Sequence, residues 1–165
     1  MPSSAPTQDS LEVVIIGAGF GGLGMAVGLQ RAGIDNWLIL EQASGLGGTW
    51  RDNTYPGCAC DVASHMYSFS FAPNPDWSRV YAPWHEIRAY LQRTAEDHHL
   101  QEKIRFDTRV TGLTWDAREC CWQVDTDQGS LHAHHVVSAH GPLSRPALPD
   151  IEGLADFRGR VFHSA

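Results

Sequence analysis

The stretch LEVVIIGAGFGG at residues 11–22 decides how this chain folds. Its first half is a run of β-branched residues, which predicts a strand buried on both faces of a parallel sheet. Its second half is rich in glycine and leads into LGMAVGLQRAG, which predicts a helix that ends near Gly33. A second apolar run, NWLILE at residues 36–41, predicts the next strand. Strand, glycine turn, helix and strand in this order form a βαβ unit.

The spacing of the glycines indicates what this unit binds. Gly17 allows a tight turn, Gly19 lets a pyrophosphate approach the backbone, and Gly22 lets the helix pack on the strand. The helix N-terminus adds free N–H groups and the positive end of the helix dipole. Glu41 ends the second strand and can accept both ribose hydroxyls of an adenosine, while its charge opposes a 2′-phosphate. The pattern therefore predicts FAD or NAD rather than NADP, and a glycine-rich turn without a ligand is the alternative.

The rest of the chain predicts a tail followed by one domain. Residues 1–10 are small and polar, and we expect them to be disordered. Residues 43–75 have no sustained period, so we expect a loop that serves a ligand, and residues 45–71 within it should pack weakly on their own and become ordered by a bound flavin. A helical pattern covers residues 83–100, and a short strand is expected over residues 103–107. Three further strands, expected over 109–116, 120–127 and 130–138, form an antiparallel meander.

The fold that these elements predict is α/β and Rossmann-like, with a central parallel sheet and the antiparallel three-strand meander as an extra layer. Residues 11–165 are expected to form this domain. The composition agrees, since 42% hydrophobic and 19% charged residues are ordinary for a globular chain. The formal net charge of −7 argues against nucleic acid or an anionic membrane as a main partner, because both require a cationic face.

Several other classes of protein are disfavoured by the sequence. The uncharged stretch at residues 13–29 is shorter than the ~20 apolar residues of a membrane span, and no basic segment precedes it. The four cysteines have no CxxC spacing, so we expect no disulfide framework, no zinc site and a reducing, cytoplasmic location. His132, His134 and His135 share one strand without a further ligand, so no metal site is expected.

Two blocks that follow the glycine turn carry a resemblance to a known family. They are GGTWRDNTYPG at residues 47–57 and CDVASHMYSFSF at residues 60–71. Together with GAGFGG, they resemble the N-terminal FAD domain of the Baeyer–Villiger monooxygenases. These are class B flavoprotein monooxygenases, related to the flavin-containing monooxygenases, and their FAD domain has a glutathione-reductase-like fold. The resemblance covers residues 11–165.

The resemblance implies roles for residues in these two blocks. In that family GGTW lies along the flavin, and the Asp after YPG sits near the isoalloxazine and the nicotinamide. By motif match these are residues 47–50 and Asp61, which makes Asp61 the candidate catalytic residue. Tyr67 matches a further flavin contact of the family. The alternatives are that Trp50 or Tyr67 is plain core, and that Asp61 is a turn or cap residue.

Two motifs near the end of the sequence extend the resemblance. SAHG at residues 138–141 matches an ATG-like run that closes on the cofactor, with His140 in place of the usual Thr. FRGRVFHS at residues 157–164 matches the first part of the family fingerprint FxGxxxHTxxW, with Ser164 in place of Thr. The Trp of the fingerprint has no counterpart within the 165 residues, so we expect an FAD-binding domain truncated before an NADP-binding domain.

Motif and resemblance together imply a flavin-dependent oxygenation. The expected cofactor-binding residues are Gly17, Gly19, Phe20, Gly22, Glu41, Gly47, Gly48, Thr49, Trp50, Ala59, Cys60, Asp61, Tyr67, Val110, Ala139 and Gly141. The implied reaction uses FAD, NADPH and O₂ to convert a ketone into an ester or lactone through a C4a-peroxyflavin, without a metal. The alternatives are oxygenation of nitrogen or sulfur in a heteroatom substrate, and a truncated FAD-binding module without turnover. We expect the isolated 165-residue chain to be inactive.

Overall fold

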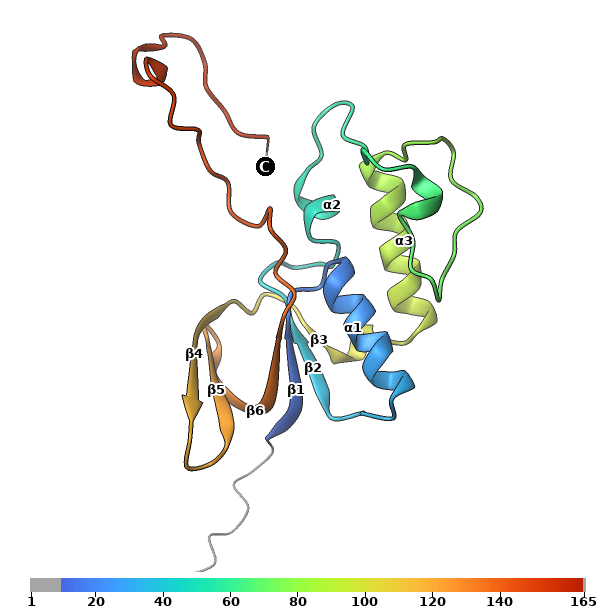
Figure 1. Cartoon of the computed structure of the whole chain (residues 1–165), viewed down its shortest axis with the longest axis vertical. Coiled ribbons are helices and arrows are strands. Elements are labelled where there is room, and N and C mark those ends of the chain that lie inside the picture. The colour runs from blue at the N-terminus through green and yellow to red at the C-terminus, as the bar shows by residue number, and fades with distance from the viewer. Residues whose placement is uncertain (1–9, 165) are drawn as a thin grey trace, which may run out of the picture.

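One mixed sheet organises the computed structural model, which describes residues 10–164 (Figure 1). The strands are β1 (Leu11–Ile16), β2 (Trp37–Leu40), β3 (Ile104–Arg105), β4 (Val110–Asp116), β5 (Cys121–Thr126) and β6 (Gly129–Ser138). The helices are α1 (Phe20–Arg31), α2 (Thr49–Asp52) and α3 (Trp84–Asp97), with 3₁₀ turns η1 (Ser64–Met66), η2 (Gln101–Lys103) and η3 (Leu154–Asp156). These elements confirm the predicted α/β fold.

The strand order places the glycine turn at the middle of the sheet. The order is β3-β2-β1-β6-β5-β4, in which the first four strands are parallel and β5 and β4 are antiparallel to their neighbours. Ile15 of β1 pairs with Ile39 of β2 on one side and with Val137 of β6 on the other. β1 is therefore a central strand, as its β-branched run predicts.

The meander is present as predicted, but it differs from the expected extra layer in one respect. Its strands are hydrogen-bonded into the same sheet as the parallel strands. The reason is the length of β6, whose ten residues pair with β1 along one edge and with β5 along the other. Ala133, for example, has Leu11 and Trp122 as its partners on the two sides.

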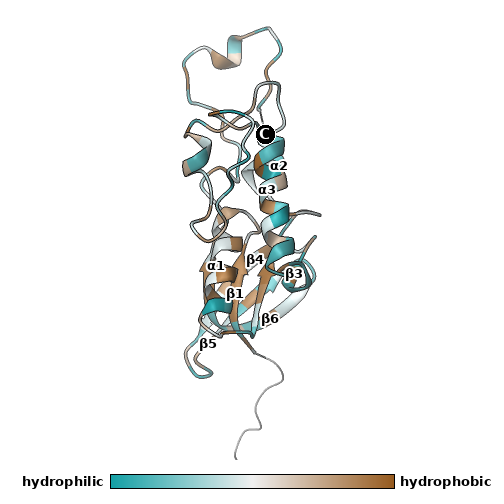
Figure 2. Cartoon of the chain, turned by 90° about the vertical axis from the view of Figure 1, so that its right-hand side faces the viewer, coloured by the Kyte–Doolittle hydropathy of each residue, from teal (hydrophilic) through white to brown (hydrophobic). Residues whose placement is uncertain are grey.

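Apolar side chains cover both faces of the sheet. Val13 and Ile15 belong to the larger core, which also contains the buried apolar side chains of α1 and α3. Val14 belongs to a smaller core with Leu40 and Val124. This division follows from the side-chain period of two along a strand. Figure 1 shows α1 and α3 on the same side of the sheet, and Figure 2 shows the strands among the most hydrophobic parts of the chain.

Within the aperiodic segment over residues 43–75, residues 45–71 are packed on the core, contrary to the expectation of weak packing. Leu46, Trp50, Cys58 and Cys60 are all buried in the larger core. These positions are irregularly spaced, so neither a helical nor a strand period reveals them in the sequence. The segment is therefore part of the folded domain and positions its side chains on the same core as α1 and α3.

The segment after β6 leaves the sheet, runs outward, and turns back so that its end lies toward α2 (Figure 1). Several of its large apolar side chains are exposed, among them Leu148, Phe157 and Phe162. The residues that match the family fingerprint lie on this segment. Gly159 allows a close approach there, because a Cβ on it would lie 2.4 Å from the ring of Phe157.

Three other expectations concern features outside the sheet. The predicted tail falls on residues 1–9, which lie outside the described residues, and on Ser10, whose hydroxyl lies 3.2 Å from Nε2 of His134. No helix in the described part of the chain is long and apolar enough to cross a membrane. Within residues 10–164, no three His, Cys, Asp or Glu side chains gather as metal ligands.

Candidate functional site

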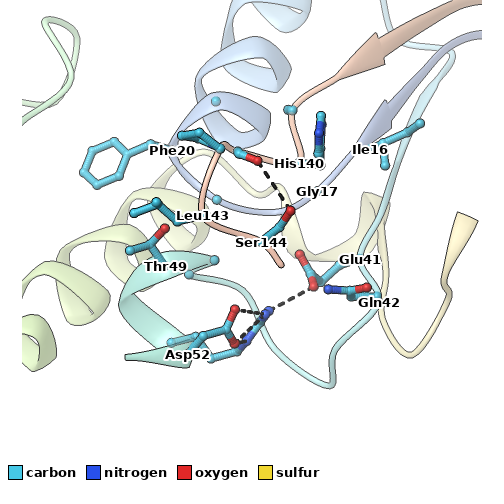
Figure 3. Close-up of a pocket in the computed structure, with 18 of the residues that line it drawn as sticks. Ile16, Gly17, Phe20, Glu41, Gln42, Thr49, Asp52, His140, Leu143 and Ser144 are labelled. Carbon is cyan, nitrogen blue, oxygen red and sulfur yellow. Dashed lines mark hydrogen bonds and ion pairs between the residues drawn. The ribbon is translucent and has the colours of Figure 1, made fainter. Parts of the chain in front are cut away.

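A pocket of about 680 Å³ opens at the carboxyl ends of the parallel strands (Figure 3). It is lined by residues 16–17 at the end of β1, residues 40–42 at the end of β2 and residues 138–145 at the end of β6. Residues 19–21 at the start of α1 and residues 47–52 around α2 complete much of the lining. From β1 the chain continues to β2, which pairs with one edge of β1, and it later returns to β6, which pairs with the other edge. In open α/β sheets, ligands bind at such a switch point, in pockets of roughly 300–1,000 Å³.

The glycine turn forms one wall of the pocket, and two of its glycines leave no room for a side chain. Gly17 has a φ of +104°, and a Cβ on it would lie 2.7 Å from the carbonyl oxygen of Ala139. A Cβ on Gly22 would lie 1.9 Å from the carbonyl oxygen of Gly17, so Gly22 allows α1 to pack on β1 as predicted. Gly19 differs from both, since a Cβ there would meet only Cα of Gly48, at 3.8 Å. Its backbone is therefore open to the pocket.

The N-terminus of α1 borders the same pocket. Gly19 is its N-cap residue, no side chain caps its first turn, and that turn contains no acidic residue. The first amides of a helix have no partner within the helix, and they lie at the positive end of its dipole. This end of α1 is therefore suited to an anionic ligand such as a pyrophosphate.

Glu41 is buried beside the turn, with 4% of its surface exposed, and its carboxylate already accepts three hydrogen bonds. Oε2 accepts from the amide of Ala18 at 2.8 Å. Oε1 accepts from the amide of Ala43 at 3.0 Å and from Nη1 of Arg51 at 2.9 Å. A carboxylate has about four lone-pair positions. One position therefore stays free, so the prediction that Glu41 accepts two ribose hydroxyls requires the exchange of one existing bond.

An aromatic pair forms another wall of the pocket. Nε1 of Trp50 donates to the hydroxyl oxygen of Tyr67 at 3.2 Å, and the two rings meet edge to face with centroids 5.5 Å apart. Phe20 also meets Tyr67 edge to face, at 5.0 Å. Burial raises the pKa of the Tyr67 phenol, the hydrogen bond from Trp50 lowers it in part, and the nearby carboxylate of Asp61 adds to the increase. Tyr67 therefore keeps its proton at neutral pH and can donate it to a ligand.

The structure brings most of the predicted site residues together in this pocket. Twelve of them line it: Gly17, Gly19, Phe20, Glu41, Gly47, Gly48, Thr49, Trp50, Tyr67, Val110, Ala139 and Gly141. Trp50 also belongs to the larger core, so the pocket and the core share this side chain. Gly22 lies behind the turn, where its role is packing.

Three predicted residues lie outside the pocket lining. Cys60 is buried in the larger core, whereas Ala59 and Asp61 are exposed on the loop that follows α2. The roles of these three residues toward a cofactor stay predictions.

The sequence reasoning missed several polar residues of the pocket. Arg51 follows the GGTW block directly, and a cation next to a ligand-binding block is a signal that could have identified it. Arg109 and Arg145 carry no such signal, because their place in the pocket depends on how β4 and the segment after β6 fold back. His140, which lies in the run predicted to close on the cofactor, also lines the pocket, and its Nδ1 lies 2.8 Å from the hydroxyl of Ser138.

A glycine turn at the switch point between β1 and β6, with an acid at the end of β2, defines a dinucleotide-binding α/β domain. The chain belongs to the family described as pyridine nucleotide-disulphide oxidoreductase, whose family model matches residues 14–164. It is 52% identical to a Baeyer–Villiger monooxygenase of Streptomyces coelicolor over 165 residues, which are 100% of this chain and 32% of that protein. It is 53% identical to one of Pseudomonas aeruginosa over 154 residues, which are 93% and 29% of the two chains.

Solved structures of similar proteins agree with these relatives. An oxidized steroid monooxygenase bound to NADP superposes with a TM-score of 0.80 at 41% identity, covering 94% of this chain and 31% of the other. A complex of OTEMO with FAD and NADP superposes with a TM-score of 0.82 at 35% identity, covering 94% and 30%. The predicted resemblance to the Baeyer–Villiger monooxygenases is confirmed. The chain spans about a third of the length of the curated relatives that it matches.

Proposed function

We propose that this chain is the FAD-binding part of an NADPH- and O₂-dependent flavoprotein monooxygenase of the Baeyer–Villiger type. The observation that carries the proposal is the pocket, where the glycine turn, the buried Glu41 and the Trp50–Tyr67 pair meet at one end of the sheet. The names of the relatives support the reaction class, and the solved OTEMO complex with FAD and NADP supports the choice of cofactors.

The residues of the pocket fit an FAD molecule part by part. Gly19 leaves room for a pyrophosphate beside the uncapped start of α1. Glu41 has a free acceptor position for an adenosine hydroxyl, and its negative charge disfavours a 2′-phosphate. Trp50 and Tyr67 offer apolar ring surface and one phenolic donor to a flat, polar-edged ring system.

When bound, FAD supplies the hydride-accepting and oxygen-activating chemistry of the reaction. The chain's own residues then bind and orient: the turn and α1 hold the phosphates, and Glu41 orients the adenosine ribose. Residues 47–50 lie along the flavin in this proposal, and Tyr67 presents its proton to the ring edge. Asp61 is the proposed catalytic residue, and its exposure leaves it accessible to the nicotinamide of NADPH.

The proposed substrate is a ketone, which is converted to an ester or lactone. A cyclohexanone monooxygenase solved with bound ε-caprolactone is 36% identical to this chain, with a TM-score of 0.81, and supports the ketone over a nitrogen or sulfur substrate. A cytoplasmic location is part of the proposal, because the reaction consumes NADPH and free cysteines such as Cys58 and Cys121 persist in a reducing compartment.

Titration of the purified 165-residue chain with FAD tests the proposal. We expect FAD to bind with quenched flavin fluorescence, and FMN to bind more weakly because it lacks the adenosine half. Glu41→Ala should weaken FAD binding about 10-fold or more, since a hydroxyl loses a charged acceptor worth ~1.5–3 kcal/mol. Glu96→Ala, an exposed position on α3, is the matched control and should leave the affinity unchanged. Equal affinity for FAD and FMN, or no binding of either, would contradict the proposal.

A further inference from the structure

A charged network at one side of the pocket joins three segments of the chain (Figure 3). Nη1 of Arg51 donates to Oε1 of Glu41 at 2.9 Å and to the carbonyl oxygen of Gly45 at 2.6 Å. Nε and Nη2 of the same guanidinium donate to the two carboxylate oxygens of Asp52 at 2.8 and 3.0 Å. Arg51 therefore connects α2 to the end of β2 and to the loop between them.

The guanidinium of Arg51 has little capacity left for a ligand. Arginine has five N–H donors, and these contacts occupy four of them. The side chain is 13% exposed, so it lies against the pocket wall and does not extend into solvent. To bind an anion in a bidentate way, the guanidinium would need two adjacent N–H donors without a partner. The effect of Arg51 on a bound nucleotide is therefore exerted through its partners.

Glu41 is the partner that faces the ligand. Its Oε1 is filled by two donors, Arg51 and the amide of Ala43, whereas its Oε2 has one donor, the amide of Ala18. The free lone pair of this carboxylate therefore lies on Oε2. The terminal torsion of a glutamate is broad, so the orientation of the carboxylate group depends on the bonds that its two oxygens accept. Arg51 supplies one of the bonds that fix it.

We propose that Arg51 is a positioning residue that aims Oε2 of Glu41 at the adenosine ribose and so sets how strongly the pocket selects for a ribose hydroxyl. This inference rests on the proposed function, in which the pocket holds the adenosine half of FAD. Without Arg51, the buried carboxylate keeps the amides of Ala18 and Ala43 but loses its cation and one of its three bonds, so a lone pair on Oε1 becomes free to compete with the one on Oε2. Lysine cannot replace the arginine fully, because one ammonium cannot reach Glu41, Asp52 and Gly45 in a planar fork.

Nucleotides that carry or lack the ribose hydroxyls test this inference. ADP contains the adenosine and pyrophosphate of FAD, and 2′,3′-dideoxy-ADP lacks both hydroxyls. We expect the unsubstituted chain to bind ADP about 10-fold more tightly than the dideoxy form, as measured by calorimetry. In Arg51→Met this ratio should fall to about 2 or less, and in Arg51→Lys it should take an intermediate value. Arg93→Met, at an exposed position on α3 outside the pocket, should keep the full ratio.

The ratio of the affinities for ADP and for 2′,3′-dideoxy-ADP distinguishes a positioning role of Arg51 from a general structural effect of its substitution. Loss of α2 packing would weaken both nucleotides equally, so a variant with lower affinity but an unchanged ratio overturns the inference. An unchanged affinity and ratio in Arg51→Met overturns it as well. If circular dichroism shows that Arg51→Met does not fold, the ratio in Arg51→Lys decides. The proposed function fails separately, when the unsubstituted chain binds neither FAD nor ADP, and the inference then fails with it.

Discussion

Residues 11–41 and residues 43–75 line the same pocket, but different kinds of interaction hold the two regions in place. In the first region, β1, α1 and β2 satisfy their backbone groups within regular elements, and Val13 and Ile15 pack on the larger core. The second region has one four-residue helix and one 3₁₀ turn. Its position depends on single buried side chains, such as Ser64, whose hydroxyl bridges to residues sixteen and eighteen positions away.

The difference teaches where a substitution should act in each region. In the first region, close packing of backbone on backbone leaves no room for added atoms, so steric changes should dominate. In the second region, a few long-range hydrogen bonds replace a regular hydrogen-bond pattern, so the loss of one donor or acceptor should dominate. Glu41 is the last residue of the first region and bonds to both regions, since it accepts hydrogen bonds from Ala18 of the first and from Arg51 of the second.

The largest expected effect tests the steric side of this comparison. A Cβ on Gly22 would lie 1.9 Å from the carbonyl oxygen of Gly17, so α1 would have to separate from β1. We expect Gly22→Ala to lower the free energy of unfolding by ~3 kcal/mol or more, as measured by urea denaturation. Gly28→Ala on the same helix is the control, since its Cβ would meet nothing within 4 Å, and it should stabilise α1 by ~0.5–1 kcal/mol. Equal effects of the two substitutions would contradict the steric explanation.

A smaller effect is expected from the hydrogen bonds of the second region. The hydroxyl of Ser64 donates to the carbonyl oxygen of Val80 at 2.8 Å and accepts from the amide of Ala82 at 2.7 Å. Ser64 and Ala82 are both buried. Ser64→Ala therefore leaves a buried amide without its acceptor, which should cost ~1–3 kcal/mol of unfolding free energy.

Chemical denaturation and hydrogen exchange of the Ala82 amide measure this cost. Ser144→Ala is the matched control, because that serine is exposed and its hydroxyl lies 3.5 Å from the carbonyl oxygen of Gly141. It should change stability by less than ~0.5 kcal/mol. If Ser64→Ala is as mild as Ser144→Ala, the second region is held by its apolar packing, and the contrast with the first region disappears.

The sequence predicted the elements of the first region and most of the pocket-lining residues of the second region. The two predictions had different grounds. The order strand, turn, helix and strand follows from local periods, and the structure confirms it over residues 11–41. The place of Trp50 and Tyr67 in the pocket came from the family resemblance, since no local period identifies them.

Other features could not be predicted because they depend on long-range geometry. The merging of the meander with the parallel strands follows from the two edges of β6, which local patterns do not describe. The three donors that fill Glu41 come from positions 18, 43 and 51, which meet only in the folded chain. Packing of residues 43–75 was underestimated because buried residues without a period resemble a loop.

The smallest expected effect concerns a contact between α3 and the loop that connects residues 43–75 to this helix. The amide of Ser78 donates to Oε2 of Glu86 on α3 at 3.2 Å. Hydrogen bonding from Ser78, first from its hydroxyl, lowers the pKa of Glu86 below its ordinary value of 4.5. Because the folded pKa is lower than the unfolded one, the contact stabilises the fold above about pH 4.5 and is lost as the pH falls through the folded pKa.

Thermal unfolding of Glu86→Gln at several pH values measures this contribution. At pH 7 we expect the variant to melt about 1 °C below the unsubstituted chain, since surface interactions of this kind are weak. The difference should shrink toward zero as the pH falls through the lowered pKa of Glu86, because the carboxylate of the unsubstituted chain then becomes protonated as well. Glu96→Gln, at an exposed position on the same helix, provides the control and should show no such trend. A difference that persists unchanged at pH 3 would mean that the charge of Glu86 does not hold this loop, and that its packing alone does.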